Sequence, residues 1–242
     1  HVMRTLRLVS GLAFFPLMLT VPAAPYAQTA AIPQADYDDR VADQGGAVFG
    51  RLRLVEGDLT LRRDDEIGAD LYPNDPVTPG DTVTTGPDGR AEMQLADGSV
   101  VRLDFDTQLI LQSLSDSSNQ IENTTILQLA TGSIIIYANE MDSSQKRFQI
   151  DTDSASVFLL SDGRFRIDVR PDGTTHVSSR RGAAEVMALE VSSIVRSGER
   201  TTVRPGRIPS DSQVFNTRLG DDFDSWSAER DDAFVRPGRV DD

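Results

Sequence analysis

Apolar and polar residues alternate over much of this chain, most clearly between residues 86 and 105. Ala91, Met93 and Leu95 take every second position, which is the spacing of a strand with one buried face. An Asp-Gly dipeptide follows directly and is typical of a tight turn between two strands. The next residues alternate in the same way through Phe105. The pattern predicts a strand, a tight turn and a second strand with one shared apolar face.

The same unit recurs in variation up to Val203, and no stretch before it has the period of an amphipathic helix. Gly163 and Gly182 mark two of the corners, and Gly132 separates another pair of expected strands. Many short strands divided by such corners predict an all-β domain at residues 47–204. The stacked coils of a β-helix or solenoid fit this pattern, and so does a two-sheet β-sandwich.

The composition changes after this domain. Residues 205–220 are predicted as a linker, residues 221–234 as a short C-terminal α-helix and residues 235–242 as a disordered tail. Asp221 and Asp222 suit the N-terminus of the helix, because carboxylates cap its free N–H groups and interact favourably with its dipole.

Three residues of the predicted helix, Phe223, Trp226 and Arg230, lie three and four positions apart and therefore share one face. This face has two interpretations. The helix either packs Trp226 against the β domain as a closing lid, or it docks on another protein. Under the second interpretation, Phe223, Trp226 and Arg230 are the candidate partner-binding residues.

Residues 1–27 are predicted to be an export signal, because Arg4 and Arg7 precede an apolar run that ends in small residues. The run is shorter than the ~20 apolar residues of a membrane span, and prolines interrupt it. We expect cleavage after Ala27, with an uncleaved anchor as the alternative. Residues 28–46 are then a disordered lead-in. The mature chain is expected to be periplasmic or secreted, with no stable membrane span.

The net charge of the 242-residue chain is −14, from 38 acidic and 24 basic residues. A charge of this sign and size repels nucleic acids, so no nucleic acid partner is expected. The chain has no cysteine, which excludes disulfides, thiolate nucleophiles and cysteine-based zinc sites.

No catalytic constellation stands out. His176 is the only histidine after the predicted signal, and its alternation with Val177 predicts a surface position. Glu92, Asp104 and Asp168 are the candidates for an acid pair of the glycosidase kind, but the two aspartates are expected on a solvated strand face. We predict no catalytic, cofactor-binding or metal site, and no cofactor.

Several arginines of the predicted β domain have two interpretations. In the first, which is the default, they pair with acids on neighbouring coils. In the second, they form a patch that binds an anionic glycan. The arginines considered are Arg62, Arg63, Arg164, Arg166, Arg180 and Arg181.

Several segments in register resemble a known family. They are residues 50–57 (GRLRLVEG), 74–81 (NDPVTPGD), 85–92 (TGPDGRAE), 95–103 (LADGSVVRL), 129–132 (LATG), 148–152 (FQIDT), 163–169 (GRFRIDV), 181–186 (RGAAEV) and 195–199 (VRSGE). Together they resemble the FecR-domain family. Residues 223–230 also resemble a segment that follows this domain in a soluble, exported subgroup.

The resemblance implies a β-helix-like binding or scaffold domain without enzymatic activity, and it favours the solenoid over the sandwich. In transmembrane members the domain is the periplasmic half of a sigma-factor regulator. We expect a departure from that pattern, because only the residues around Arg4 and Arg7 stand before the apolar run and the run is expected to be cleaved.

We therefore expect a non-enzymatic, exported binding or scaffold module of the bacterial cell envelope. Its expected partner is an envelope protein or a cell-wall glycan, and it is expected to be a monomer or a weak dimer. The alternative is a periplasmic sensor of a sigma-factor signalling pathway, held by an uncleaved N-terminal anchor.

Overall fold

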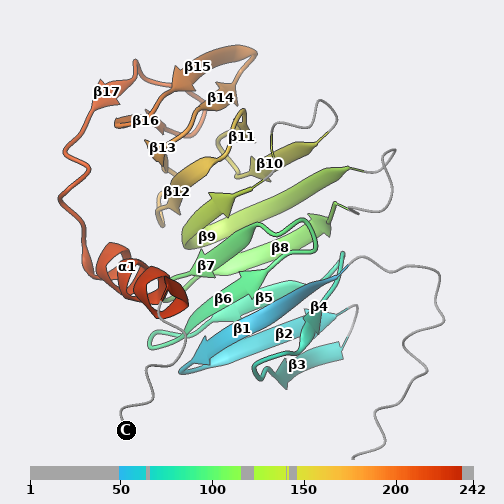
Figure 1. Cartoon of the computed structure of the whole chain (residues 1–242). Coiled ribbons are helices and arrows are strands. Elements are labelled where there is room, and N and C mark those ends of the chain that lie inside the picture. The colour runs from blue at the N-terminus through green and yellow to red at the C-terminus, as the bar shows by residue number, and fades with distance from the viewer. Residues whose placement is uncertain (1–48, 64–65, 116–122, 140, 142–145, 236–242) are drawn as a thin grey trace, which may run out of the picture. The chain divides into compact units, whose positions relative to one another are not determined.

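Short strands follow one another along the computed structural model, and one helix comes last (Figure 1). The structure describes residues 49–63, 66–115, 123–139, 141 and 146–235. The predicted signal and lead-in lie outside these residues, as does the predicted tail after Val235. The strands are β1 (Gly50–Glu56), β2 (Leu59–Arg63), β3 (Glu66–Asp70), β4 (Pro76–Val77), β5 (Thr82–Thr85), β6 (Arg90–Gln94), β7 (Val100–Leu103), β8 (Gln108–Ser113), β9 (Thr124–Ala138), β10 (Arg147–Asp151), β11 (Ser156–Leu159), β12 (Gly163–Val169), β13 (Thr175–Arg181), β14 (Ala184–Ala188), β15 (Val191–Val195), β16 (Glu199–Val203) and β17 (Gln213–Val214), and the helix is α1 (Asp222–Val235).

The described strands form two sheets that share β9. Sheet A has the order β4-β1-β6-β7-β9-β12-β13-β16-β17. Sheet B has the order β3-β2-β5-β8-β9-β10-β11-β14-β15. Apart from β4 and β3, which lie outside β1 and β2 at the first end, strand order follows chain order along each sheet, and neither sheet closes into a barrel (Figure 1).

This architecture confirms the all-β class with one short C-terminal helix. Successive strands of the chain are added along one direction of the stack, and a solenoid has the same feature. The described pairings are antiparallel except for β9 with β10, so neighbouring strands mostly reverse direction. A β-helix would stack parallel strands, and the arrangement is instead two facing sheets built largely from antiparallel pairs.

The segment from β6 to β7 forms the predicted hairpin, with Ala91 opposite Leu103 and Gly98 in the turn at a φ of 80°. The second strand is shorter than expected, because it ends at Leu103 and the chain turns at Asp106 with a φ of 50°. Phe105 therefore leaves the apolar face, and 37% of it is exposed. The prediction that it continues the buried alternation is wrong.

The expected break at Gly132 is also wrong, because β9 runs through this position. Its first half pairs with β8 and β10 in sheet B, and its second half pairs with β7 and β12 in sheet A. Gly132 has a φ of 88°, and a Cβ there would lie 2.3 Å from the hydroxyl oxygen of Thr107. That hydroxyl accepts a hydrogen bond from the N–H of Ser133 (3.0 Å). The glycine thus lets the strand cross from one sheet to the other.

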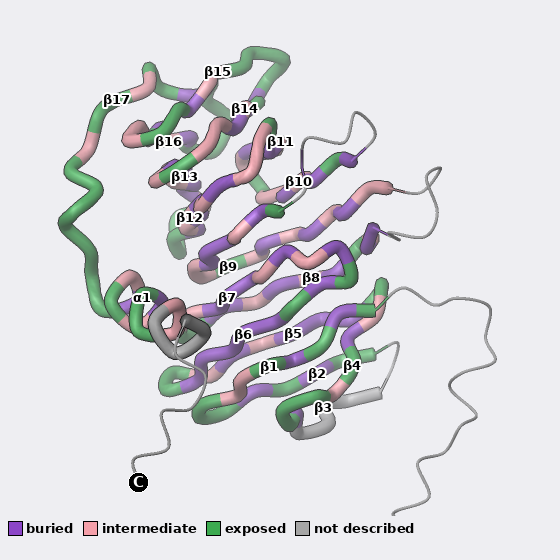
Figure 2. The backbone as a smooth tube through the Cα atoms, in the orientation of Figure 1, coloured by how far each residue is buried: buried purple, intermediate pink, exposed green. Residues whose placement is uncertain are grey.

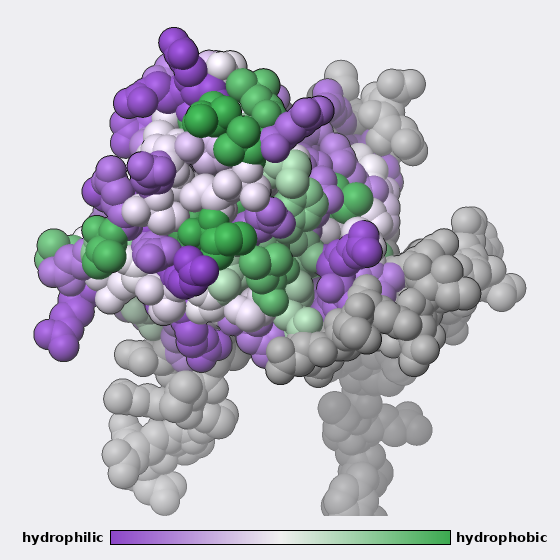
Figure 3. All heavy atoms as spheres, turned by 90° about the horizontal axis from the view of Figure 1, so that it is seen from above, coloured by the Kyte–Doolittle hydropathy of each residue, from purple (hydrophilic) through white to green (hydrophobic). Residues whose placement is uncertain are grey.

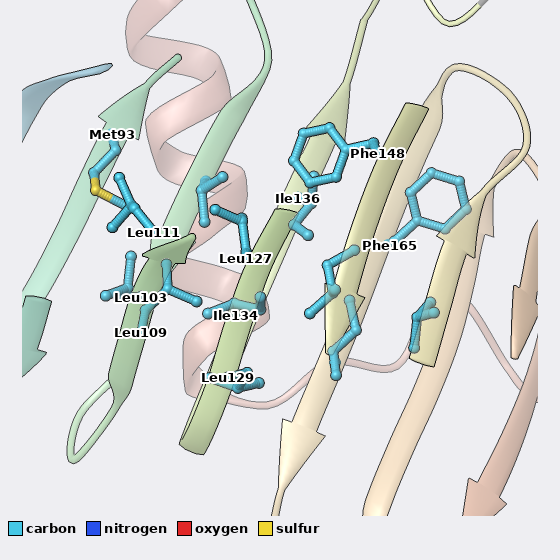
Figure 4. Close-up of a cluster of buried hydrophobic side chains, with 14 of the residues drawn as sticks. Met93, Leu103, Leu109, Leu111, Leu127, Leu129, Ile134, Ile136, Phe148 and Phe165 are labelled. Atoms are coloured by element: carbon cyan, nitrogen blue, oxygen red, sulfur yellow. The ribbon is translucent and has the colours of Figure 1, made fainter. Parts of the chain in front are cut away.

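The hydrophobic core lies between the two sheets, where the inward side chains of each sheet meet (Figures 2 and 4). Alternation along each strand supplies these side chains, as a half-buried sheet requires. The close-up labels Met93, Leu103, Ile134, Ile136 and Phe165 from sheet A and Leu109, Leu111, Leu127, Leu129 and Phe148 from sheet B, all at most 1% exposed.

The last strands of both sheets lie at one end of the stack, where β15 closes sheet B and β17 closes sheet A. Viewed from this end, the surface shows apolar groups separated by polar ones (Figure 3). Leu189 and Val214 are among the exposed apolar residues of these connections and strands. β17 falls within the predicted linker, so part of that linker pairs with sheet A.

Candidate functional site

The outer face of sheet A, which points away from sheet B, carries arginines in place of the apolar residues of the inner face. They come from β6, β7, β12 and β13, because residues that alternate with core positions must point outward. We call this set the arginine face: Arg90, Arg102, Arg164, Arg166 and Arg180. Helix α1 lies over it and brings acidic side chains into contact with the arginines (Figure 1).

The centre of this interface is a buried ion pair. The Arg102 Nε donates to Glu92 Oε2 at 2.8 Å, and their side chains are 2% and 0% exposed. The two residues lie directly opposite each other in the β6–β7 hairpin. On the helix side, Arg102 Nη1 donates to the Ser227 carbonyl (2.5 Å) and hydroxyl (2.7 Å) and pairs with Asp231 (2.8 Å). Burying a charge is costly unless it is paired, and here the pair and the helix together satisfy it.

A second contact forms around Arg90. Its Nε donates to Asp104 at 2.8 Å and its Nη2 to Asp222 at 2.6 Å. The guanidinium lies 4.1 Å from the ring centroid of Phe105 and 5.3 Å from that of Trp226, within the range of cation–π attraction. Burial opposes the charged form, but the hydrogen bonds to Asp222 and Asp104 outweigh it, so the pKa of Arg90 is raised.

Asp224 forms the third contact, since three arginines converge on its carboxylate. Arg166 and Arg180 approach it at 3.0 and 2.9 Å, and Arg164 at 3.4 Å. Asp221 pairs with Arg166 at 2.7 Å, and the same oxygen accepts the Asp224 N–H at 3.0 Å. Asp221 is therefore the N-cap of α1, as the sequence predicts. The hydrogen bond from Arg166 is the main reason why the pKa of Asp221 falls to about 2.

The candidate partner-binding residues all contact the β domain of their own chain. Phe223 is buried and stacks on Trp226, with ring centroids 5.9 Å apart. The Trp226 Nε1 donates to Glu56 at 2.9 Å, and Arg230 donates to Glu92 at 3.3 Å. Helix α1 thus packs as a lid. Binding of an external partner by these residues stays a prediction.

The residues considered for catalysis have other partners in the structure, although Asp168 and His176 lie opposite each other on β12 and β13. Glu92 is the buried partner of Arg102, Asp104 accepts from Arg90, and Asp168 accepts from Arg166 (2.8 Å) and Ser133 (2.7 Å). His176 is half-buried, and its Nδ1 lies 2.9 Å from the Thr202 hydroxyl oxygen. Among the described residues, no three His, Cys, Asp or Glu side chains are grouped so that they could hold a metal ion.

The arginines whose ion pairs the structure describes do pair with acids, but mostly not with acids on neighbouring coils. Arg63 pairs with Asp81 at 2.7 Å, and Arg164, Arg166 and Arg180 pair with acids at the start of α1. Most of these acids come from the helix and not from a neighbouring strand, which the sequence analysis did not foresee. The pairing of Glu92 with Arg102 could have been predicted from the sequence. Both residues lie five positions from Asp97 in the turn, so they face each other across the hairpin.

Comparison with known families identifies the domain that carries this face. Residues 81–185 match the family model described as FecR protein. The chain contains a FecR domain. The match extends from the start of β5 into β14 and includes the whole arginine face, whereas α1 lies beyond it.

Two solved structures are similar to this chain, both of a proposed anti-sigma factor from Parabacteroides distasonis. They are 18% and 17% identical to it, each with a TM-score of 0.47. Each match covers 57% of this chain and only 61% of the solved chain. No curated protein matches the chain. Within the part of the chain that the structure describes, none of the helical segments has the length and apolar character needed to span a membrane.

Proposed function

We propose that this FecR-domain chain is a periplasmic sensor in a sigma-factor signalling pathway, and that it acts by binding a protein partner without catalysing a reaction. The family match over residues 81–185 carries this proposal, because the family is regulatory. In the proposal, the N-terminal apolar run holds the chain at the membrane. The role predicted first from the sequence, an exported binding or scaffold module, is the second candidate, and the exposed arginines described in the next subsection favour it.

Helix α1 is the element through which we propose that the signal passes. It lies outside the family match, and its contacts with the domain are mainly ion pairs and hydrogen bonds. Of its described side chains, only Phe223 and Ser227 are buried. Release of α1 would expose the arginine face together with Phe223 and Trp226, so one event changes two surfaces that a partner protein could bind.

The first test is fractionation of the native bacterium with N-terminal sequencing of this protein. An intact chain in the membrane fraction supports the sensor. A soluble chain that starts near Gln28 contradicts signalling across the membrane and supports the exported binding module.

The second test is transcription in an in-frame deletion strain, complemented with the wild-type gene or with an Asp224→Asn variant, which removes the carboxylate shared by three arginines. The sensor predicts that promoters of one alternative sigma factor change together on deletion, and that the variant shifts the same promoters. An unchanged transcript profile in the deletion strain would contradict the proposal.

A further inference from the structure

A groove of about 910 Å³ lies on the outer face of sheet A, beside the arginine face. Strands β12, β13 and β16 form its floor. Residues 210–224, which run from the linker into the start of α1, form one wall. Five arginines line it against three aspartates, in a chain whose net charge is −14. Positive charge is therefore concentrated in this groove.

The strand register sets the positions of four of these arginines. Arg166 lies opposite Ser178 on β13, and Ser178 lies opposite Arg200 on β16. Neighbouring strands are about 4.8 Å apart, so the Cα atoms of Arg166 and Arg200 are separated by about 10 Å. Arg170 and Arg204 lie four residues further along the same faces, about 13 Å away. The four arginines thus frame a rectangle with His176 at its centre and with Ser178, Thr202 and Asp168 on its sides, where Asp168 lies opposite His176 and accepts from Arg166.

Two kinds of arginine line the groove. Arg166 and Arg180 are engaged by Asp221 and Asp224. Arg170, Arg200 and Arg204 are exposed, and none of them forms an ion pair with another residue in the described part of the chain. These three guanidinium groups are available to a ligand.

His176 lies in the middle of the groove floor, and its pKa is influenced by the positive charges around it. Its pKa is lowered, first by burial and then by the charge of Arg170, and Arg200 acts in the same direction. Asp168 and Asp172 oppose this effect. The imidazole is therefore neutral at pH 7 and offers hydrogen bonds without adding charge.

We propose that this groove binds an anionic oligosaccharide, with its carboxylate or phosphate groups paired to Arg170, Arg200 and Arg204. Arginine presents a planar fork of donors that matches both of these groups. Ser178, Thr202 and the other hydroxyl groups of the lining suit sugar hydroxyls. The start of α1 forms one wall of this groove, but the inference rests on Arg170, Arg200 and Arg204 and not on the proposed signalling role.

The groove suits a glycan better than a peptide. Strand addition needs a free sheet edge, whereas β12 and β13 pair on both sides, and on β16 the backbone of Thr202 is hydrogen-bonded to Ser210 beyond the two residues that pair with β17. The aliphatic side chains of Val169 and Val177 point into the core. The floor thus lacks both the edge and the apolar pockets that anchor peptides.

The test is binding of fluorescently labelled α-1,4-linked trigalacturonic acid to the purified chain, measured by anisotropy. The variant is the triple substitution R170Q/R200Q/R204Q, and the matched control is R62Q/R147Q/R196Q, which removes the same charge from exposed arginines outside the groove. We expect the groove variant to weaken binding by about tenfold or more and the control to leave it nearly unchanged.

Three results would overturn the proposal. They are the absence of saturable binding at millimolar trigalacturonate, equal weakening by the two triple variants, and tighter binding of an aspartate-rich peptide than of the uronide. Neutral trigalactose is the ligand control and is expected not to bind, because the arginines supply the recognition. Circular dichroism of each variant shows whether it is folded.

Discussion

The two faces of sheet A are joined to their neighbours by different forces. The inner face meets sheet B through side chains such as Phe165 and Ile134, which are fully buried and apolar. The outer face meets α1 through arginines and carboxylates, with Phe223 as the one fully buried apolar side chain that the described helix contributes. Salt screens the outer pairs that reach solvent, such as Arg90 with Asp222, and screens the buried pair of Arg102 and Glu92 much less. We therefore expect the part of the outer interface that faces solvent to weaken in salt before the inner interface does.

The largest expected effect is on the inner face. Phe165→Ala removes a ring with no exposed surface and leaves a cavity, so we expect a loss of about 3–5 kcal/mol in the free energy of unfolding. Urea denaturation followed by circular dichroism measures it. Tyr72→Ala is the control, because Tyr72 is 64% exposed and its loss is expected to cost little. Equal losses in the two variants would show that the inner face is not the stabilising core.

The next effect tests the buried pair of the outer face. Arg102→Gln leaves Glu92 charged and buried, and we expect a loss of about 3 kcal/mol. The double variant Arg102→Gln/Glu92→Gln removes both charges and is expected to recover part of this loss. A double-mutant cycle in urea measures the coupling. If the two single losses simply add, the residues do not act as a pair.

The inner face could be predicted from the sequence much better than the outer one. Strict alternation around Met93 and Leu103 specifies which side chains point inward, because a strand has a period of two. Two predictions were wrong, and both concerned whether the chain continues as a strand or turns. Gly132 was expected to end a strand, and Phe105 was expected to continue one. Glycine favours both turns and bends, and only the pairing partners on each side decide between them.

The outer face required tertiary information. Asp221 could be predicted as a helix cap, because capping depends on neighbours in sequence. Arg102 and Ser227 are 125 positions apart, and nothing local in the sequence indicates that they meet. Glu92 was expected to follow the polar side of its strand, and it does. Its burial involves α1, since Arg230 contacts it together with Arg102 of the neighbouring strand.

A smaller effect is expected from loosening α1 without touching the core. Asp224→Asn removes the carboxylate that three arginines share, and we expect a loss of about 1–2 kcal/mol in the stability of the docked helix. Trp226 is the only tryptophan, so its emission reports the helix directly. We expect a red shift and faster proteolysis in residues 205–220, with the β domain intact. Asp211→Asn in the exposed linker is the control, and the same shift there would contradict the assignment.

The smallest effect is a titration of the same contact. The hydrogen bond from Arg166 is the main reason why the pKa of Asp221 is about 2 in the folded chain. The pKa of an aspartate in an unfolded chain is about 4. A carboxylate whose pKa is lowered by folding contributes its full stabilisation above the unfolded value and loses it as the pH falls towards the folded value. We therefore expect the Trp226 emission to shift between about pH 4 and pH 2, and at a higher pH in 1 M salt than in 0.05 M salt, because salt screens the contact with Arg166.

Asp221→Asn separates this contact from general acid unfolding. The variant lacks the carboxylate that titrates, so its helix is expected to be looser at pH 6 and to change less between pH 4 and pH 2. Circular dichroism at 215 nm monitors the sheets over the same range. An identical acid transition in the variant and the wild type would place the titrating group elsewhere. A helix signal that changes before the sheet signal would show that the outer interface opens while the inner one holds.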